Sequence, residues 1–242
     1  MSETRPSTGG HRPRLALHGA GRMGRQLAEA SESAGFSLVG VIARHQPDWL
    51  TEDLYAASPE QLVVRPDVII DFSLPGGAAS VAQWCAGNGV PLVSGTTGLD
   101  ETARAELDTA SAKIPLLWAA NFSIGLNACL VLAKRLRELV GTDAPARILD
   151  IHHAGKLDAP SGTALVLGEA IGGDVEYDSV REGDAIGEHH LVLELADEQI
   201  EIRHVANDRR LFALGALHAA RWLCSRSPGR YTMLDCIDAA TP

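Results

Sequence analysis

Residues 14–44 read RLALHGAGRMGRQLAEASESAGFSLVGVIAR, and this stretch decides the fold. A short apolar run at 15–18 leads into a glycine-rich segment at 19–24, and a helical pattern follows to about Ala34. A second apolar run, Ser37–Arg44, comes next. The order of strand, glycine-rich turn, helix and strand predicts a βαβ unit with parallel strands and a right-handed crossover.

The same alternation continues as far as Trp118. The expected strands are Asp67–Phe72, Pro91–Ser94 and Ile114–Trp118, and the expected helices are Ala78–Ala86 and Asp100–Ala112. The run DVIIDF at 67–72 is typical of parallel strands that are covered on both faces. We therefore predict an α/β protein whose first domain is a Rossmann-type parallel sheet. The link from Gln46 to Arg65 is irregular and receives no assignment.

The pattern changes after Phe122. The expected elements are the helix Leu126–Val140, the strand Arg147–His152, the helix Gly162–Ile171 and the strands His190–Leu195 and Gln199–Val205. The last two strands are joined by a short link, which suggests an antiparallel hairpin. This order predicts a second, α+β domain with a mixed sheet.

These patterns also predict the domain boundaries. Residues 1–12 are polar and are expected to be a disordered lead-in. Residues 13–122 and 226–242 are expected to form a dinucleotide-binding domain, with the C-terminal tail returning to it. Residues 123–225 are expected to form a domain for substrate binding and oligomerisation, which includes an amphipathic helix at Leu211–Cys224.

Composition excludes several classes of protein. The chain has 242 residues and a formal charge of −10, which argues against a nucleic-acid binder because such a protein needs a basic surface. No apolar run is as long as the roughly 20 residues of a membrane helix. The four cysteines form no CxxC pair, which predicts reduced thiols in a cytoplasmic protein without a metal site.

The segment GAGRMG is a GxGxxG motif placed between a strand and a helix, the context in which the motif predicts a dinucleotide site. Gly19 permits a tight turn, Gly21 lets a pyrophosphate approach the backbone, and Gly24 allows close packing of helix and strand. A glycine-rich turn without a ligand is the alternative. The cofactor-binding residues expected here are Gly19, Ala20, Gly21, Arg22, Met23 and Gly24.

The end of the second strand bears on the choice between NAD and NADP. Dinucleotide folds that prefer NAD usually carry Asp or Glu there, and this sequence has Ala43 followed by Arg44. An arginine can pair with the 2′-phosphate of NADPH through its guanidinium group. We therefore expect NADPH to be preferred, with NADH possible as a cofactor. The alternative is that Arg44 is only a solvated residue at the end of a strand.

Residues 150–163, DIHHAGKLDAPSGT, are the most informative stretch for chemistry. His152, His153 and Lys156 follow a strand, where they suit proton transfer and anion binding. Ser161 is a good N-cap, so the free N–H groups of Gly162 and Thr163 would form a second anion site, one suited to a carboxylate. Each of these residues alone would most often be a surface or core residue without a catalytic role. Their combination within one segment favours catalysis.

The segment HHAGKLDAPSGTAL at 152–165 resembles the signature HHxxKxDAPSGTA of the 4-hydroxy-tetrahydrodipicolinate reductase (dihydrodipicolinate reductase) family. The resemblance covers about residues 14–238. Further segments agree in the same order: GRMGRQL at 21–27, DVIIDFSLP at 67–75, SGTTGL at 94–99, AANFSIGLN at 119–127, GDAIGEHH at 183–190 and FALGALHAARWL at 212–223.

The resemblance implies hydride transfer from NAD(P)H to a cyclic imine-type dicarboxylate, in lysine and diaminopimelate biosynthesis, by a homotetramer. It implies that His152 and Lys156 are catalytic, and that His153 and the Gly162–Thr163 pair contact the substrate. Ser161 is also expected to bind the substrate, because it caps the helix that begins at Gly162. Contacts on the nicotinamide side are implied for Gly95, Thr96, Thr97, Ala119, Ala120, Asn121 and Phe122.

The sequence departs from the family pattern at several points. Aligning on Arg22-Met23-Gly24 places His18 at the usual first glycine, so the phosphate turn is expected to be one residue tighter. Ala43 replaces the usual acidic residue, and the segment at 172–179 is shorter than in many members, which weakens the expectation of a tetramer. Two other functions stay open: a different two-domain NADP oxidoreductase, and a non-catalytic NADPH sensor that would not need His152 or Lys156.

Overall fold

The computed structural model describes residues 12–141 and 143–238. The expected lead-in lies outside the described residues, apart from Arg12. The described chain divides into two compact units. The first contains the residues up to Asn121 together with Ala213–Thr232, and the second contains Phe122–Phe212 and the residues from Met233 onwards. Within the described part, no helix is both long and apolar enough to span a bilayer.

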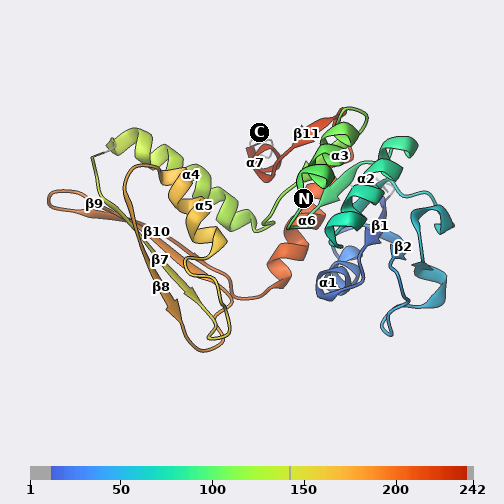
Figure 1. Ribbon diagram of the computed structural model, residues 1–242, viewed down its shortest axis with the longest axis horizontal. Helices are drawn as coiled ribbons and strands as arrows, with labels where there is room; N and C mark the ends of the chain where they lie inside the picture. Colours follow the sequence, from blue (N-terminus) through green and yellow to red (C-terminus); the bar gives the residue numbers. More distant parts are fainter. Residues whose placement is uncertain (1–11, 142, 239–242) are drawn as a thin grey trace, which may run out of the picture. The chain divides into compact units, whose positions relative to one another are not determined.

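A parallel sheet forms the centre of the first unit (Figure 1). Its strand order is β11-β6-β5-β4-β1-β2-β3, and every neighbouring pair is parallel. The strands are β1 (Arg14–His18), β2 (Ser37–Ile42), β3 (Tyr55–Ala56), β4 (Val68–Asp71), β5 (Leu92–Ser94), β6 (Pro115–Trp118) and β11 (Gly229–Tyr231). The chain changes direction across the sheet between β1 and β4, and open α/β sheets bind ligands at such switch points.

Helices pack against this sheet because their small and apolar residues face its buried side chains. The helices are α1 (Arg22–Ser31), α2 (Pro75–Asn88), α3 (Glu101–Ser111) and α6 (Arg210–Leu223), of which α6 belongs to this unit from Ala213. Ala82 and Cys85 of α2 and Leu107 of α3 share one apolar cluster with Ile69 and Leu92 of the sheet. The predicted Rossmann-type domain is confirmed.

The irregular link between β2 and β4 contains short elements that sequence patterns do not reveal. They are the 3-10 helices η1 (Glu52–Leu54) and η2 (Pro59–Gln61), with β3 between them. β3 is only a short strand, so it lacks the length over which alternation can be recognised. Its pairing with β2 extends the parallel sheet.

The second unit is built on a separate mixed sheet of order β10-β9-β7-β8. β10–β9 and β9–β7 are antiparallel, whereas β7–β8 is parallel. The strands are β7 (Ala146–His152), β8 (Val175–Arg181), β9 (Glu188–Glu194) and β10 (Gln199–Val205). The antiparallel hairpin and the mixed sheet predicted for this part of the chain are both present, although β9 begins at Glu188 rather than at His190.

The helices α4 (Ile124–Val140) and α5 (Gly162–Ile171) cover one face of this sheet (Figure 1). Ala133, Ala164 and Leu167 of the helices share an apolar cluster with Ile148 and Leu191 of the sheet. The short helix α7 (Met233–Asp238) packs on α4. The other face mixes charged side chains, such as Arg147 and Glu176, with apolar ones, such as Leu149 and Val192.

β8 is the main element that the sequence analysis missed. The segment at 172–179 looked like a shortened connection, but Val175–Arg181 pairs with β7 along its whole length. Its sequence, VEYDSVR, lacks a continuous apolar run because only one side of the strand contacts the core. Tyr177 takes part in that contact: a Cβ at position 168 of α5 would lie within 1.8 Å of its hydroxyl oxygen, so Gly168 makes room for it.

The C-terminal part also differs from the expected domain boundary. α6 was placed in the second domain, but from Ala213 it belongs to the first unit. β11 pairs with β6 of the first sheet, as expected for a returning tail, but α7 belongs to the second unit. The boundary missed these exchanges because an amphipathic pattern shows that a helix is packed, without showing against what.

Candidate active site

The predicted phosphate turn is folded tightly after β1. Gly19 has φ +103°, a conformation that favours glycine, and a Cβ there would lie 2.4 Å from the Phe72 carbonyl oxygen. A Cβ at Gly24 would lie 2.0 Å from the Gly19 carbonyl oxygen. The phosphate turn therefore packs directly against the first residues of α1. Side chains at Gly19 and Gly24 would prevent this contact.

Gly21 differs from these two glycines because open space surrounds the position of its absent Cβ. It is the N-cap of α1, and no side chain caps this helix within the described residues. α2 also begins without a side-chain cap, whereas Asp100, Ser123 and Ser161 cap α3, α4 and α5. Amide groups at uncapped helix starts can bind anions, so this edge of the sheet fits the pyrophosphate of a dinucleotide.

The two glycines of the turn predict contrasting mutants. Gly21→Ala should keep the melting temperature within a few degrees and weaken dinucleotide binding, because the new methyl group projects into the space left for phosphate. Gly24→Ala should lower the stability of the protein as well, because the methyl group meets backbone. Thermal unfolding and nucleotide titration check both. Equal loss of stability in the two variants would contradict the prediction.

The other residues predicted to bind cofactor lie at the start of α1 or follow the strands β2, β5 and β6. Arg44 and Arg22 are exposed, and Thr97 is exposed as well. Thr96 is buried: its hydroxyl donates to Asp71 at 2.8 Å, and its carbonyl accepts from Trp118 Nε1 at 2.9 Å. Gly95, Ala119, Ala120 and Asn121 lie in the loops after β5 and β6. Phe122 is buried and belongs to the second unit, so the structure does not group it with the others.

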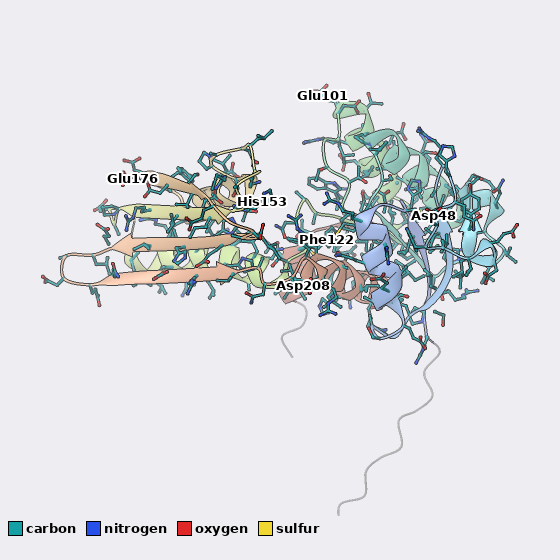
Figure 2. The ribbon with its side chains drawn as sticks, turned by 90° about the horizontal axis from the view of Figure 1, so that it is seen from below. Asp48, Glu101, Phe122, His153, Glu176 and Asp208 are labelled. Carbon is teal, nitrogen blue, oxygen red and sulfur yellow. The ribbon has the colours of Figure 1, made fainter. Side chains whose placement is uncertain are left out.

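The predicted catalytic segment joins β7 to α5 in the second unit. β7 ends at His152, and the loop that follows is held by hydrogen bonds from the His153 amide to Ala185 O and from the Lys156 amide to His153 O. Ser161 caps α5 by accepting from the Ala164 amide at 3.1 Å. Figure 2 shows His153 just beyond the end of the sheet.

Asp150 organises the residues around this segment. Its carboxylate is fully buried and accepts hydrogen bonds from the Ser161 amide and hydroxyl at 2.9 and 2.8 Å. The Arg181 guanidinium of β8 donates to it at 2.7 Å. Burial acts to raise the pKa of Asp150, but hydrogen bonds from His189, Arg181 and Ser161 outweigh it, so the pKa lies well below its usual range. Asp150 is therefore ionised and joins three strands to the start of α5.

His152 lies beside this carboxylate. Its Nδ1 is 2.8 Å from Asp150 Oδ1, but the geometry is not that of an aligned hydrogen bond, so we describe the contact as electrostatic. Burial lowers the pKa of His152. Asp150 acts to raise this pKa, and interactions with His189, Lys156 and Arg181 lower it further. The net shift is downward, which leaves His152 neutral at pH 7.

Two further histidines continue from His152 across the second sheet. The His189 ring is 5.1 Å from the His152 ring, in an edge-to-face arrangement, and 6.2 Å from the His204 ring. His204 Nε2 in turn lies 3.2 Å from the Ser123 hydroxyl at the start of α4. Burial lowers the pKa of His204.

Lys156 is the most accessible cationic group of the segment. Its Nζ lies 2.8 Å from Asp158 Oδ1, and 23% of its side chain is exposed. The contact with Lys156 lowers the pKa of Asp158. Gly162 is exposed and Thr163 is half-buried at the start of α5. Lys156, His153 and this helix start therefore place positive charge and free N–H groups on one loop–helix segment.

Asp150, His152 and His189 also offer ligand atoms within 4.8 Å of one another, a set that metal ions can use. The oxygens of Asp150 already accept from Arg181 and Ser161, and the guanidinium would repel a cation. The arrangement therefore suits the placement of protons better than the binding of a metal.

Comparison with known proteins identifies the family. The family model "Dihydrodipicolinate reductase, N-terminus" matches residues 13–122, and "Dihydrodipicolinate reductase, C-terminus" matches 125–237. The chain belongs to the dihydrodipicolinate reductase family. The resemblance inferred from the sequence is thereby confirmed.

Relatives within the family are similar along nearly their whole length. The 4-hydroxy-tetrahydrodipicolinate reductase of Xanthomonas campestris pv. campestris (strain B100) is 43% identical over 233 residues, which cover 93% of this chain and 97% of that protein. The protein of the same name from Alkalilimnicola ehrlichii is 38% identical over 260 residues, covering 92% and 97%.

Solved structures confirm the expected fold class. A dipicolinate-bound dihydrodipicolinate reductase from Paenisporosarcina sp. TG-14 gives a TM-score of 0.80 at 22% identity, covering 92% of this chain and 98% of that one. Aspartate dehydrogenase from Thermotoga maritima gives a TM-score of 0.56 at 15% identity, covering 90% and 99%. At these identities the likeness concerns the fold alone.

The sequence analysis assigned no role to several residues around the site of this family member. Asp150 stands two positions before His152, so period-2 alternation places the two side chains on the same face of β7. That signal was available. Arg181 and His189 come from β8 and β9, and only the pairing of strands brings them to Asp150.

Proposed function

We propose that this protein reduces 4-hydroxy-tetrahydrodipicolinate (dihydrodipicolinate) to tetrahydrodipicolinate with NAD(P)H, a step of lysine and diaminopimelate biosynthesis. The observation that carries the proposal is the segment from β7 to α5, where a neutral His152, the Lys156 ammonium group and a serine-capped helix start lie together. Membership of the family supports the same reaction.

Each part of the segment has a place in this chemistry. The nicotinamide, when bound, supplies the hydride. Hydride addition to a conjugated imine leaves negative charge that a proton must neutralise. His152 is buried and neutral, whereas Lys156 is partly exposed and held by an exposed carboxylate, so we assign delivery of the proton to Lys156. We assign to His152 the role of a neutral hydrogen-bonding group beside the reacting ring.

The substrate is a dianion, and the protein carries a formal charge of −10, so binding depends on local groups. We assign one substrate carboxylate to the N–H groups of Gly162 and Thr163 at the start of α5. The Ser161 side chain is almost fully buried and its hydroxyl is bonded to Asp150, so Ser161 supports this site by capping the helix. We assign His153, which is only partly buried, to contact with the substrate.

The direct test is an assay coupled to dihydrodipicolinate synthase, in which oxidation of NADPH is followed by absorbance. We expect turnover that depends on the synthase product. An amino-acid dehydrogenase would instead oxidise NADPH with a keto acid and ammonia, and a non-catalytic sensor would bind NADPH without turnover. Either result would contradict the proposed reaction.

We also propose that NADPH is preferred to NADH. Arg44 is exposed after β2, where it can pair with a 2′-phosphate. Arg44→Ala should lower kcat/KM for NADPH by about 10- to 100-fold, the value of a charge-assisted hydrogen bond, and leave that for NADH nearly unchanged. His45→Ala, at the neighbouring exposed position, is the control. Wild-type kcat/KM with NADH equal to or above that with NADPH would overturn the preference.

We further infer a homotetramer from the family resemblance and a cytoplasmic location from the pattern of the cysteines. Cys85, Cys129, Cys224 and Cys236 are free thiols in the structure. Burial raises the pKa of Cys85 and Cys129, so these thiols are protonated at neutral pH.

A further inference from the structure

His18 and Asp71 form a pair at the switch point of the first sheet. His18 is the last residue of β1 and Asp71 is the last residue of β4, and the two are register partners in the parallel pairing. His18 Nδ1 is hydrogen-bonded to Asp71 Oδ1 at 2.8 Å. The residue after His18 is Gly19, where the phosphate turn begins. An ionisable pair therefore stands at the edge where α/β sheets bind dinucleotides.

Asp71 is ionised and fixed in place. It is fully buried, and its Oδ2 accepts from the hydroxyls of Ser94 and Thr96 at 2.7 and 2.8 Å. Burial acts to raise the pKa of Asp71, but hydrogen bonds from His18, Ser73 and Ser94 outweigh it, and the pKa lies below its ordinary value. The carboxylate thus holds Nδ1 of His18 in place.

The remaining edge of the His18 ring faces the start of α2. A Cβ added at Gly77, in the first turn of α2, would lie 3.1 Å from His18 Cε1, and 15% of the His18 side chain is exposed. The start of a helix carries partial positive charge, which disfavours a cation beside it. An anion bound at this edge would offset the partial positive charge of the helix start and would attract a positive charge on His18.

Apart from His45, the other charged groups near this edge are not imidazoles. Arg22 and Arg25 remain charged, Arg25 pairs with Glu29, and the Cys85 thiol is kept protonated by burial. His45 is the remaining imidazole among them. The titratable and charged side chains on the packed elements are Asp71 on β4, Arg22, Arg25 and Glu29 on α1, Cys85 on α2, and Arg44 and His45 beyond β2.

We propose that His18 is a cofactor-binding residue that takes up a proton when the dinucleotide binds, so that its imidazolium ion lies beside the pyrophosphate. Asp71 acts through His18 as a positioning residue. The inference rests on the pyridine-nucleotide site of the proposed function, and it requires neither the substrate nor the second unit. It makes the affinity for the cofactor depend on pH in a direction fixed by the charge: binding weakens as pH rises and the imidazole loses its proton.

The test uses NADH, which lacks the 2′-phosphate and its own titration near neutral pH. Calorimetric titration of the full chain, in two buffers of different ionisation enthalpy, counts the protons taken up on binding. We expect net uptake of up to one proton, and an affinity that falls about fivefold or more between pH 6 and pH 8.5. Nucleotide binding without proton uptake would overturn the role of His18 and leave the proposed function standing. Failure to bind either nucleotide would overturn both.

Matched variants locate the proton. His18→Asn retains an N–H group that can donate to Asp71 but has no titrating nitrogen, so its affinity should be the same at pH 6 and pH 8.5. His45→Asn removes the neighbouring imidazole and should retain the wild-type dependence. The same proton uptake in His18→Asn as in the wild type would assign the proton elsewhere and overturn the inference. If His18→Asn does not fold, proton uptake by His45→Asn equal to that of the wild type still supports His18, and its loss would exclude it.

Discussion

Replacing Lys156 with alanine is expected to lower kcat/KM by about 10²- to 10⁴-fold, the usual contribution of a positioned proton donor. The fold should be unaffected, because the Lys156 side chain contacts the exposed Asp158 rather than the core. The variant loses both the proton and the positive charge that attracts the substrate. Steady-state kinetics together with circular dichroism check the prediction, and near-wild-type activity would remove Lys156 from the mechanism.

Two further variants separate the possible causes. Leu157→Ala is the matched control, because its side chain is 99% exposed and its neighbour Lys156 is unchanged. Lys156→Arg keeps the charge but replaces the ammonium group with a guanidinium group, which does not release its proton. We expect Lys156→Arg to preserve KM better than kcat. A variant with full kcat would show that charge, rather than proton delivery, is the contribution of Lys156.

Replacing Asp150 with alanine is expected to destabilise the second unit by about 3–5 kcal/mol, the usual cost of leaving one partner of a buried ion pair alone. Arg181, of which only 15% of the side chain is exposed, would lose its carboxylate, and Ser161 would lose two hydrogen bonds at the start of α5. Denaturant unfolding at pH 7 measures the change. Asp178→Asn on β8 is the control, because its ion pair with Arg147 is about half exposed and should contribute little.

The same residue predicts how stability depends on pH. The pKa of Asp150 is lower in the folded protein than in the unfolded chain, so its contribution is present above the unfolded value of about 3.9 and is lost as pH falls below it. Asp150→Asn should therefore lose less stability than the wild type between pH 5 and pH 3. Denaturant unfolding measures the stability of both proteins at each pH. The same loss of stability in Asp150→Asn as in the wild type would contradict a buried, ionised Asp150.

The elements that could be predicted are those whose sequence signals lie within a few neighbouring residues. The phosphate turn, α1 and the hairpin of β9 and β10 were predicted because period, glycine spacing and a short link are local features. β8 was missed because its sequence alternates with polar residues and its identity as a strand depends on pairing with β7. α6 from Ala213 onwards and α7 fall in other units than expected, because the choice of packing partner is a property of the whole chain.

The sequence by itself determined the family, the βαβ order and the segment from His152 to Thr163 that carries the chemistry. These features are short motifs, in which neighbouring residues act on one turn or one helix start. Only the tertiary structure decided that Asp150 joins Arg181, His189 and Ser161, and that His18 meets Asp71, 53 positions further along the chain. The physical reason is that a buried charge needs partners from every element around it, and strand pairing selects those partners.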